Sequence, residues 1–149
     1  MATKDIWIFS ATEELEGELL LQTGDDLKSV TGIEKLVNIF THIFFTEVGS
    51  DLIYSDTGTQ FSEVIGGNLF FNEGTANGFL TLAVVETFEI ISDDQQEIEL
   101  SSTLPDDEFL KESNLLDFSI LSDTVNLSVE LISRAGAKRV IRIPLKHAV

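Results

Sequence analysis

The segment from residue 31 to residue 50 constrains the fold more than any other part of the chain. Its apolar residues recur at the spacing of one helical face, and they are Ile33, Leu36, Val37, Phe40, Ile43 and Phe44. Thr31 and Glu34 have the spacing of a capping box at the start of this helix. Gly49 is expected to end it, because glycine adopts a left-handed backbone without a Cβ penalty. An apolar face of this size has to be covered, so the rest of the chain is expected to pack around it.

Two alternating segments near the C-terminal end predict a β-hairpin. Residues 124–132 place apolar side chains on one face and polar side chains on the other. Residues 138–145 alternate as well, and the turn between the two segments contains a glycine. Pro144 has no N–H to donate, so the last strand is expected to lie at a sheet edge or to end there.

The other segments predict further helices and strands. Residues 75–93 predict a second long helix; because they are apolar nearly all round, a buried strand over part of them is the alternative. Thr59 is expected to begin a short helix. Short strands are expected at residues 4–9, 18–22 and 115–121.

These elements together predict an α+β fold, with helices packed on a small antiparallel sheet that contains the C-terminal hairpin. At 149 residues the chain is most simply one domain. Residues 1–112 are expected to be mainly helical, and residues 113–149 to form the hairpin region.

The charge of the chain is strongly acidic and unevenly distributed. The formal net charge is −17, which argues against a nucleic-acid partner. All 26 acidic residues precede residue 134, whereas the last 16 residues contain only basic charges: Arg134, Lys138, Arg139, Arg142 and Lys146. A basic end on an acidic body suits an acidic partner, such as another copy of the chain. The alternative is that this end folds back on its own acidic body.

The sequence contains no recognisable catalytic, metal or cofactor motif. The chain has no cysteine, which excludes disulfides and thiolate ligands. The compartment is most simply the cytosol. His42 and His147 are isolated histidines without metal-ligand spacing. No apolar segment is long enough for a membrane span, and the N-terminal residues lack the pattern of a signal peptide. We therefore expect no catalytic, metal or cofactor-binding residues and no membrane partner.

Four short motifs, taken in order, resemble a family of contractile-tailed phages. They are Gly24-Asp25, Thr31-Gly32-Ile33-Glu34-Lys35-Leu36-Val37, Phe45-Thr46-Glu47-Val48-Gly49-Ser50 and Asp56-Thr57-Gly58-Thr59. The chain resembles the baseplate wedge protein that initiates the tail sheath, a family once described as a tail lysozyme. In that family a second long helix and a C-terminal sheet follow these motifs, which is the order of elements expected here.

The resemblance implies a structural protein rather than an enzyme. It implies a place in the virion, at the tail baseplate, after assembly in the host cytoplasm. The implied partners are the sheath protein and other baseplate wedge and hub proteins, with several copies of the chain arranged in a ring.

The resemblance also implies two protein-binding surfaces. The C-terminal strands of the family receive extended arms of the first sheath ring by strand addition. That use implies binding residues in the last strand: Lys138, Arg139, Val140, Ile141, Arg142 and Ile143. A loop of the family with a Pro- and Arg-containing triplet docks on the central wedge bundle. Here the loop reads Ser55-Asp56-Thr57-Gly58, so only Asp56 and Gly58 correspond.

Two other interpretations stand beside this one. The cations of the last strand can instead protect a sheet edge against aggregation. The acidic charge also suits a cytosolic inhibitor or immunity-type protein that binds a basic partner. That class explains the charge of −17 but leaves the basic hairpin unexplained.

Overall fold

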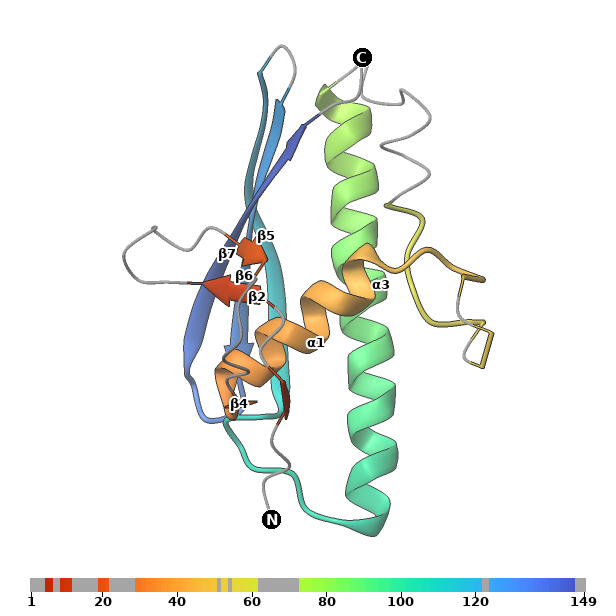
Figure 1. Ribbon diagram of the computed structural model, residues 1–149, viewed down its shortest axis with the longest axis vertical. Coiled ribbons are helices and arrows are strands. Elements are labelled where there is room, and N and C mark those ends of the chain that lie inside the picture. Colours follow the sequence, from red (N-terminus) through yellow and green to blue (C-terminus); the bar gives the residue numbers. More distant parts are fainter. Residues whose placement is uncertain are drawn as a thin grey trace.

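In the computed structural model, the described residues form two helices and a three-stranded antiparallel sheet, together with two short strand pairs (Figure 1). The structure describes residues 5–6, 9–11, 19–21, 29–50, 52–53, 55–61, 73–121 and 124–146. The helices are α1 (Ile33–Phe45) and α3 (Glu73–Ser101), and the sheet consists of β5 (Leu110–Leu121), β6 (Thr124–Ser133) and β7 (Lys138–Lys146). The predicted α+β class and its C-terminal hairpin, β6–β7, are confirmed.

The helices cover one face of the sheet. α1 crosses the strands obliquely and contacts β6, β7 and α3, while α3 runs beside β5 (Figure 1). The core includes the apolar face predicted for α1, with Leu36, Phe40 and Phe44 fully buried. It continues through Leu80 and Ile91 of α3 to all three strands. The core therefore joins the helical part and the hairpin region in one cluster.

The predicted ends of α1 are wrong. The helix is capped at Gly32, whose φ is 65°, and no side chain of its own segment caps it, so Thr31 and Glu34 form no capping box. Glu108, a residue far along the chain, accepts a hydrogen bond from the Gly32 N–H instead (3.3 Å). The helix ends at Phe45, before an extended Thr46, whose N–H makes the last helical hydrogen bond to the His42 carbonyl oxygen and whose hydroxyl bonds the same oxygen.

The second helix is confirmed but is longer than predicted. α3 continues to Ser101, so the alternative of a buried strand is wrong. The Glu, Gln, Leu and Ile residues of this stretch all favour helix. Gln95 also faces inward, where its side chain bonds the chain at both Glu108 and Leu110.

The first and third predicted strands also differ from the structure. β1 (Asp5–Ile6) pairs with β4 (Ser29–Val30), and β2 (Phe9–Ala11) pairs with β3 (Leu19–Leu21), so the single strand predicted at 4–9 is wrong. β3 agrees with the strand predicted at 18–22. β5 begins at Leu110, so the predicted division between residues 112 and 113 falls inside a strand. The helix predicted after Thr59 lies outside the described residues, except for its first residues. The Thr59 hydroxyl accepts a hydrogen bond from the Phe61 N–H (3.2 Å), as predicted for a helix cap.

Candidate functional site

The last strand, β7, forms one edge of the three-stranded sheet. The strand order is β5-β6-β7, and β7 pairs with β6 without a register shift from Lys138 to Lys146. β3 lies beside β7 but pairs with β2. Among the described strands, β6 is therefore the only one that forms a ladder with β7.

The register shows which backbone groups of β7 point away from β6. The Ser133 N–H donates to the Ala137 carbonyl oxygen at the hairpin turn (2.9 Å). Because alternate residues of an antiparallel strand bond to the same neighbour, Arg139, Ile141 and Ile143 direct their backbone groups towards β6. Lys138, Val140 and Arg142 direct theirs outward. Pro144 shares the outward positions, where its missing N–H leaves the ladder intact.

The side chains of β7 divide between the core and the surface in the same alternation. Lys138, Val140 and Arg142 are exposed on the face of the sheet away from the helices. Ile141 and Ile143 are only 1% and 4% exposed and belong to the core. As side chains they are therefore core residues, and a role of these two residues in binding a partner stays a prediction.

Two cations of the basic end do fold back on the acidic body. Arg139 pairs with Glu34 of α1. Arg134 pairs with Glu99 at 2.8 Å and with Asp106 at 2.7 Å. The hydrogen bonds to Glu99 and then Asp106 raise the pKa of the Arg134 guanidinium above its ordinary value. Of the residues predicted to bind a partner, Arg139 instead links β7 to α1 through its ion pair with Glu34.

Asp56 and Gly58 lie at the other end of α1, away from β7. The loop after α1 folds back on the helix end, where the Thr59 N–H donates to the Thr46 carbonyl oxygen (2.9 Å) and its hydroxyl to that of Phe44 (2.8 Å). Gly58 is buried with φ 127°, and a Cβ there would lie 2.5 Å from the Thr46 oxygen. Gly58 is thus needed for the close approach, whereas Asp56 is exposed. The structure does not bring these two residues together with the β7 residues.

The sequence analysis missed two exposed apolar residues in this loop. The side chains of Leu52 and Ile53 are 100% and 81% exposed, and Val48 is 48% exposed nearby in the chain. The loop that carries them is closed by hydrogen bonds from Gly49 N–H to the Ser55 oxygen and from Ser50 N–H to the Glu47 oxygen (both 3.0 Å). Leu52 and Ile53 directly follow Gly49-Ser50-Asp51, and an apolar pair after such turn-forming residues is a signal that the sequence alone contains.

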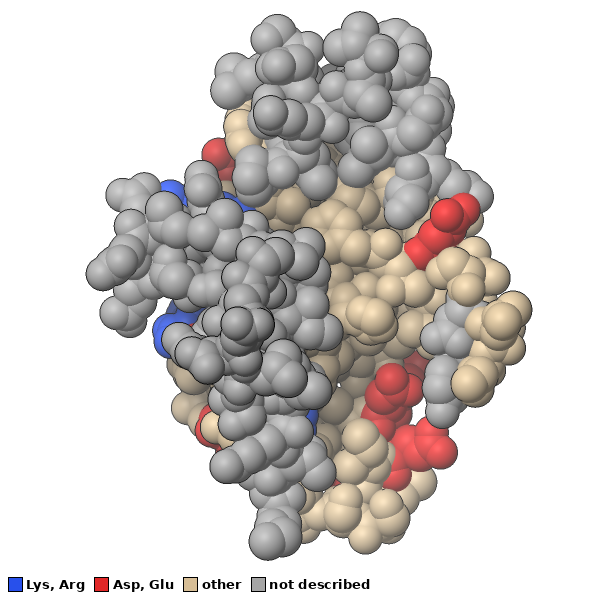
Figure 2. Space-filling view, viewed as in Figure 1, with Lys and Arg blue, Asp and Glu red and all other residues tan. Residues whose placement is uncertain are grey.

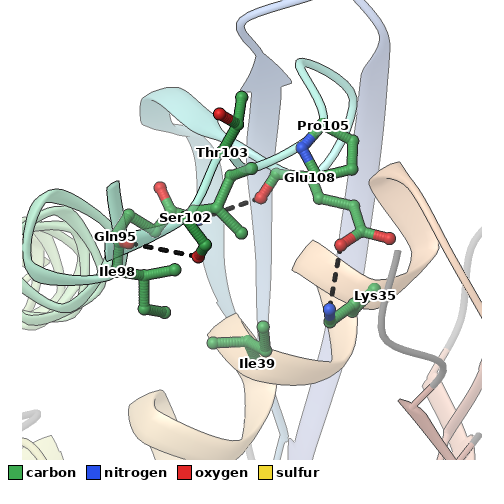
Figure 3. Close-up of a pocket in the computed structure, with 9 residues that line it drawn as sticks. Lys35, Ile39, Gln95, Ile98, Ser102, Thr103, Pro105 and Glu108 are labelled. Atoms are coloured by element: carbon green, nitrogen blue, oxygen red, sulfur yellow. Dashed lines mark hydrogen bonds and ion pairs between the residues drawn. The ribbon is translucent and has the colours of Figure 1, made fainter. Parts of the chain in front are cut away.

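A cleft of about 660 Å³ lies between α1, the C-terminal end of α3 and the chain that leads into β5 (Figure 3). Lys35 and Glu108 pair on its wall at 2.9 Å, and Glu108 is 3% exposed. Figure 3 shows this pair together with the apolar side chains of Ile39 and Ile98. The same Glu108 carboxylate holds the first N–H of α1, so the polar groups of this cleft join structural elements.

The charges that remain exposed differ between the two sides of the molecule. In Figure 2 acidic side chains gather over the lower part of α3, while most visible cations lie towards the side where β7 runs. His42 is exposed, and His147 lies outside the described residues. Within the described residues, no group of three His, Cys, Asp or Glu side chains is placed to hold a metal ion. In the same part of the chain, no helix has the length and apolar character for a membrane span.

Comparison with protein-family models, with curated proteins and with solved structures gave no match to this chain.

Proposed function

We propose that this chain is a structural component of a contractile phage tail baseplate, which joins the wedge to the first sheath ring and initiates sheath assembly by strand addition. The observation that supports this proposal best is the regular edge of β7. Its outward backbone positions at Lys138 and Val140 suit main-chain pairing with another strand. The motifs of residues 24–59 support the same assignment.

The opposite end of α1 suits contact with the wedge. The exposed pair Leu52 and Ile53 is carried on a hydrogen-bonded loop beside Asp56. Exposed apolar side chains on a closed loop are typical of a contact that buries them. In this proposal α1 separates the two contacts, with β7 near its first turn and the loop after its last turn.

The direct test is nucleation of sheath. The sheath subunit encoded in the same phage genome is purified and observed by electron microscopy and sedimentation, with and without this chain. We expect short sheath rings or tubes to form at sheath concentrations where the subunit alone stays unassembled. An acidic inhibitor or immunity-type protein would leave the sheath subunit unchanged, which would contradict the proposal.

Val140→Pro tests whether the contact is strand addition. Proline removes the outward N–H at the centre of the edge, and Pro144 occupies the same kind of position in the native strand. We expect the variant to fold and to lose nucleation. Val140→Ala, which keeps the N–H, is the matched control and should nucleate normally. Equal nucleation by both variants would show that backbone pairing at β7 is not the contact.

A further inference from the structure

We propose that the cleft between α1, the end of α3 and the chain leading into β5 binds a segment of a partner protein that carries a bulky apolar side chain beside a lysine or arginine. This site is additional to the two contacts of the proposed function and does not depend on them. The features that carry it are the tied walls of the cleft, its apolar lining and the acidic charge beside it.

Two side chains tie the walls of the cleft together. Glu108 accepts hydrogen bonds from the Gly32 N–H of α1 (3.3 Å) and from the Lys35 ammonium group (2.9 Å; Figure 3). The Gln95 side chain of α3 donates to the Glu108 carbonyl oxygen and accepts from the Leu110 N–H (both 3.0 Å). Both helices are therefore joined to the same short stretch before β5. A cleft with walls joined in this way is formed before a ligand arrives, which lowers the ordering cost of binding.

The lining of the cleft suits an apolar side chain. Ile39, Ile98 and Leu104 all line it. Ile98 is 43% exposed, although the helical period places it on the same face of α3 as the buried Ile91 and Gln95. The volume of about 660 Å³ is within the range of about 300–1,000 Å³ that is typical of ligand sites. The cleft can thus accept a bulky side chain together with its neighbouring residues.

The charge beside the cleft suits a cation. Asp94 lies four residues before Ile98, so the two side chains are neighbours on the surface of α3. Within the described part of the chain, no Lys or Arg pairs with Asp94. Desolvation, then the charges of Glu97 and Asp93, raise the pKa of the Asp94 carboxyl. A cation bound there would relieve this repulsion.

An acidic segment suits the cleft less well. Lys35, the cation among its described lining residues, is already paired with Glu108. The net charge of −17 repels an acidic segment and attracts a basic one, which also speeds the encounter. A second copy of this chain carries the same net charge, so a basic partner is the better occupant.

Peptide titration followed by NMR on the full chain tests the proposal. The probe is a capped peptide with the core Lys-Phe-Leu-Lys. We expect it to shift the amide signals of Lys35, Ile98 and Ser102, with saturation in the millimolar range. Two matched peptides, Glu-Phe-Leu-Glu and Lys-Ala-Ala-Lys, should each bind at least about fivefold more weakly. Equal affinity for the three peptides, or saturable shifts only outside the cleft, would overturn the proposal.

A pair of charge variants tests the part of Asp94. Asp94→Lys should weaken binding of the Lys-Phe-Leu-Lys peptide by about threefold to tenfold at low salt, and by less at high salt. Glu89→Lys is the matched control, because Glu89 lies nine residues before Ile98 and so on the opposite side of α3. It should change the affinity by less than about twofold. A Gln-Phe-Leu-Gln peptide should not distinguish the two variants. If Asp94→Lys weakens that neutral peptide equally, Asp94 does not recognise the cation and the proposal is wrong.

A second pair of variants tests the apolar wall. Ile98→Arg places a long cationic side chain at the cleft and should abolish saturable binding of the Lys-Phe-Leu-Lys peptide. Leu100→Arg is the matched control, because Leu100 is 89% exposed in the same turn of α3 and does not line the cleft. Undiminished binding by Ile98→Arg, or an equal loss in both variants, would contradict the proposal. Sheath nucleation is measured separately, so either outcome leaves the proposed function standing.

Discussion

The two edge strands of the sheet, β5 and β7, differ in regularity, charge and cover. β5 lies beside α3, contains two register shifts and exposes Glu112 and Asp117. β7 runs without a shift and exposes Lys138 and Arg142. Bulges and a covering helix are common ways in which proteins prevent pairing at a sheet edge. The contrast indicates that pairing is discouraged at β5 by register shifts that the β6–β7 ladder lacks.

The two edges are also joined to α1 in different ways. On the β5 side, Glu108 is buried and binds both the Gly32 N–H and the Lys35 ammonium group. On the β7 side, Arg139 meets Glu34 at the surface, where its side chain is 46% exposed. Buried charge-assisted hydrogen bonds contribute more to stability than exposed ion pairs. α1 is therefore held more firmly on the β5 side than on the β7 side.

Phe40→Ala tests whether both edges depend on the same core. Phe40 is fully buried in α1 and stacks with Phe44 at a ring distance of 5.8 Å. Removal of a buried aromatic ring should lower the free energy of unfolding by about 3–5 kcal/mol. Urea unfolding followed by fluorescence and by circular dichroism measures the change. A loss under roughly 1 kcal/mol would contradict the assignment of Phe40 to the core.

Ile141→Ala tests whether β7 is part of the core as well as an edge. Its buried side chain should make the change cost about 2–5 kcal/mol of stability. Val140→Ala is the matched control on the exposed face and should change stability by less than about 1 kcal/mol. Comparable losses for the two variants would mean that β7 does not divide into a buried and an exposed face.

Replacing Glu108 or Arg139 should change the free energy of unfolding less than the two core substitutions do. Glu108→Ala removes the acceptor for the first N–H of α1, and we expect a loss of about 1–3 kcal/mol. Arg139→Ala should cost at most about 1 kcal/mol, and that cost should shrink at high salt. Chemical unfolding of both variants at low and high salt checks the order. A reversed order would show that α1 is anchored mainly on the β7 side.

Local patterns in the sequence predicted much of this fold. The helical period placed Leu36, Phe40 and Phe44 in the core, and the alternation after residue 124 predicted both strands of the hairpin. These patterns are local, because each element is read from its own residues. Pro144 predicted that the last strand lies at a sheet edge or ends there, and β7 is an edge strand of the three-stranded sheet.

The features that could not be predicted depend on distant parts of the chain. The cap of α1 comes from Glu108, which is 76 residues from Gly32 in the sequence. The bulges of β5 exist only in relation to β6. For the candidate site, alternation separated Ile141 from Val140 but could not show which face α1 would cover. The resemblance implies the whole strand as a binding surface, whereas the side chains of Ile141 and Ile143 lie in the core.

Asp94→Asn tests the acidic α3 side of the comparison and has the smallest expected effect. Desolvation, then the negative charges of Glu97 and Asp93, raise the pKa of the Asp94 carboxyl above its ordinary value. The folded state therefore disfavours the charged form, which lowers stability at neutral pH. That loss disappears as the pH falls through the raised pKa towards the ordinary value of 3.8.

We therefore expect Asp94→Asn to be more stable than the natural chain at neutral pH, by a few tenths of a kcal/mol for a surface position. The difference should vanish at acidic pH, where the natural carboxyl is already protonated in the folded state. Asp117→Asn, the same charge change on exposed β5, is the control without Asp93 and Glu97 as neighbours. Thermal unfolding across the pH range measures the difference for both variants. If Asp94→Asn lowers stability at neutral pH, the Asp94 charge makes a favourable contact. Repulsion from Glu97 and Asp93 would then not destabilise the acidic side of α3.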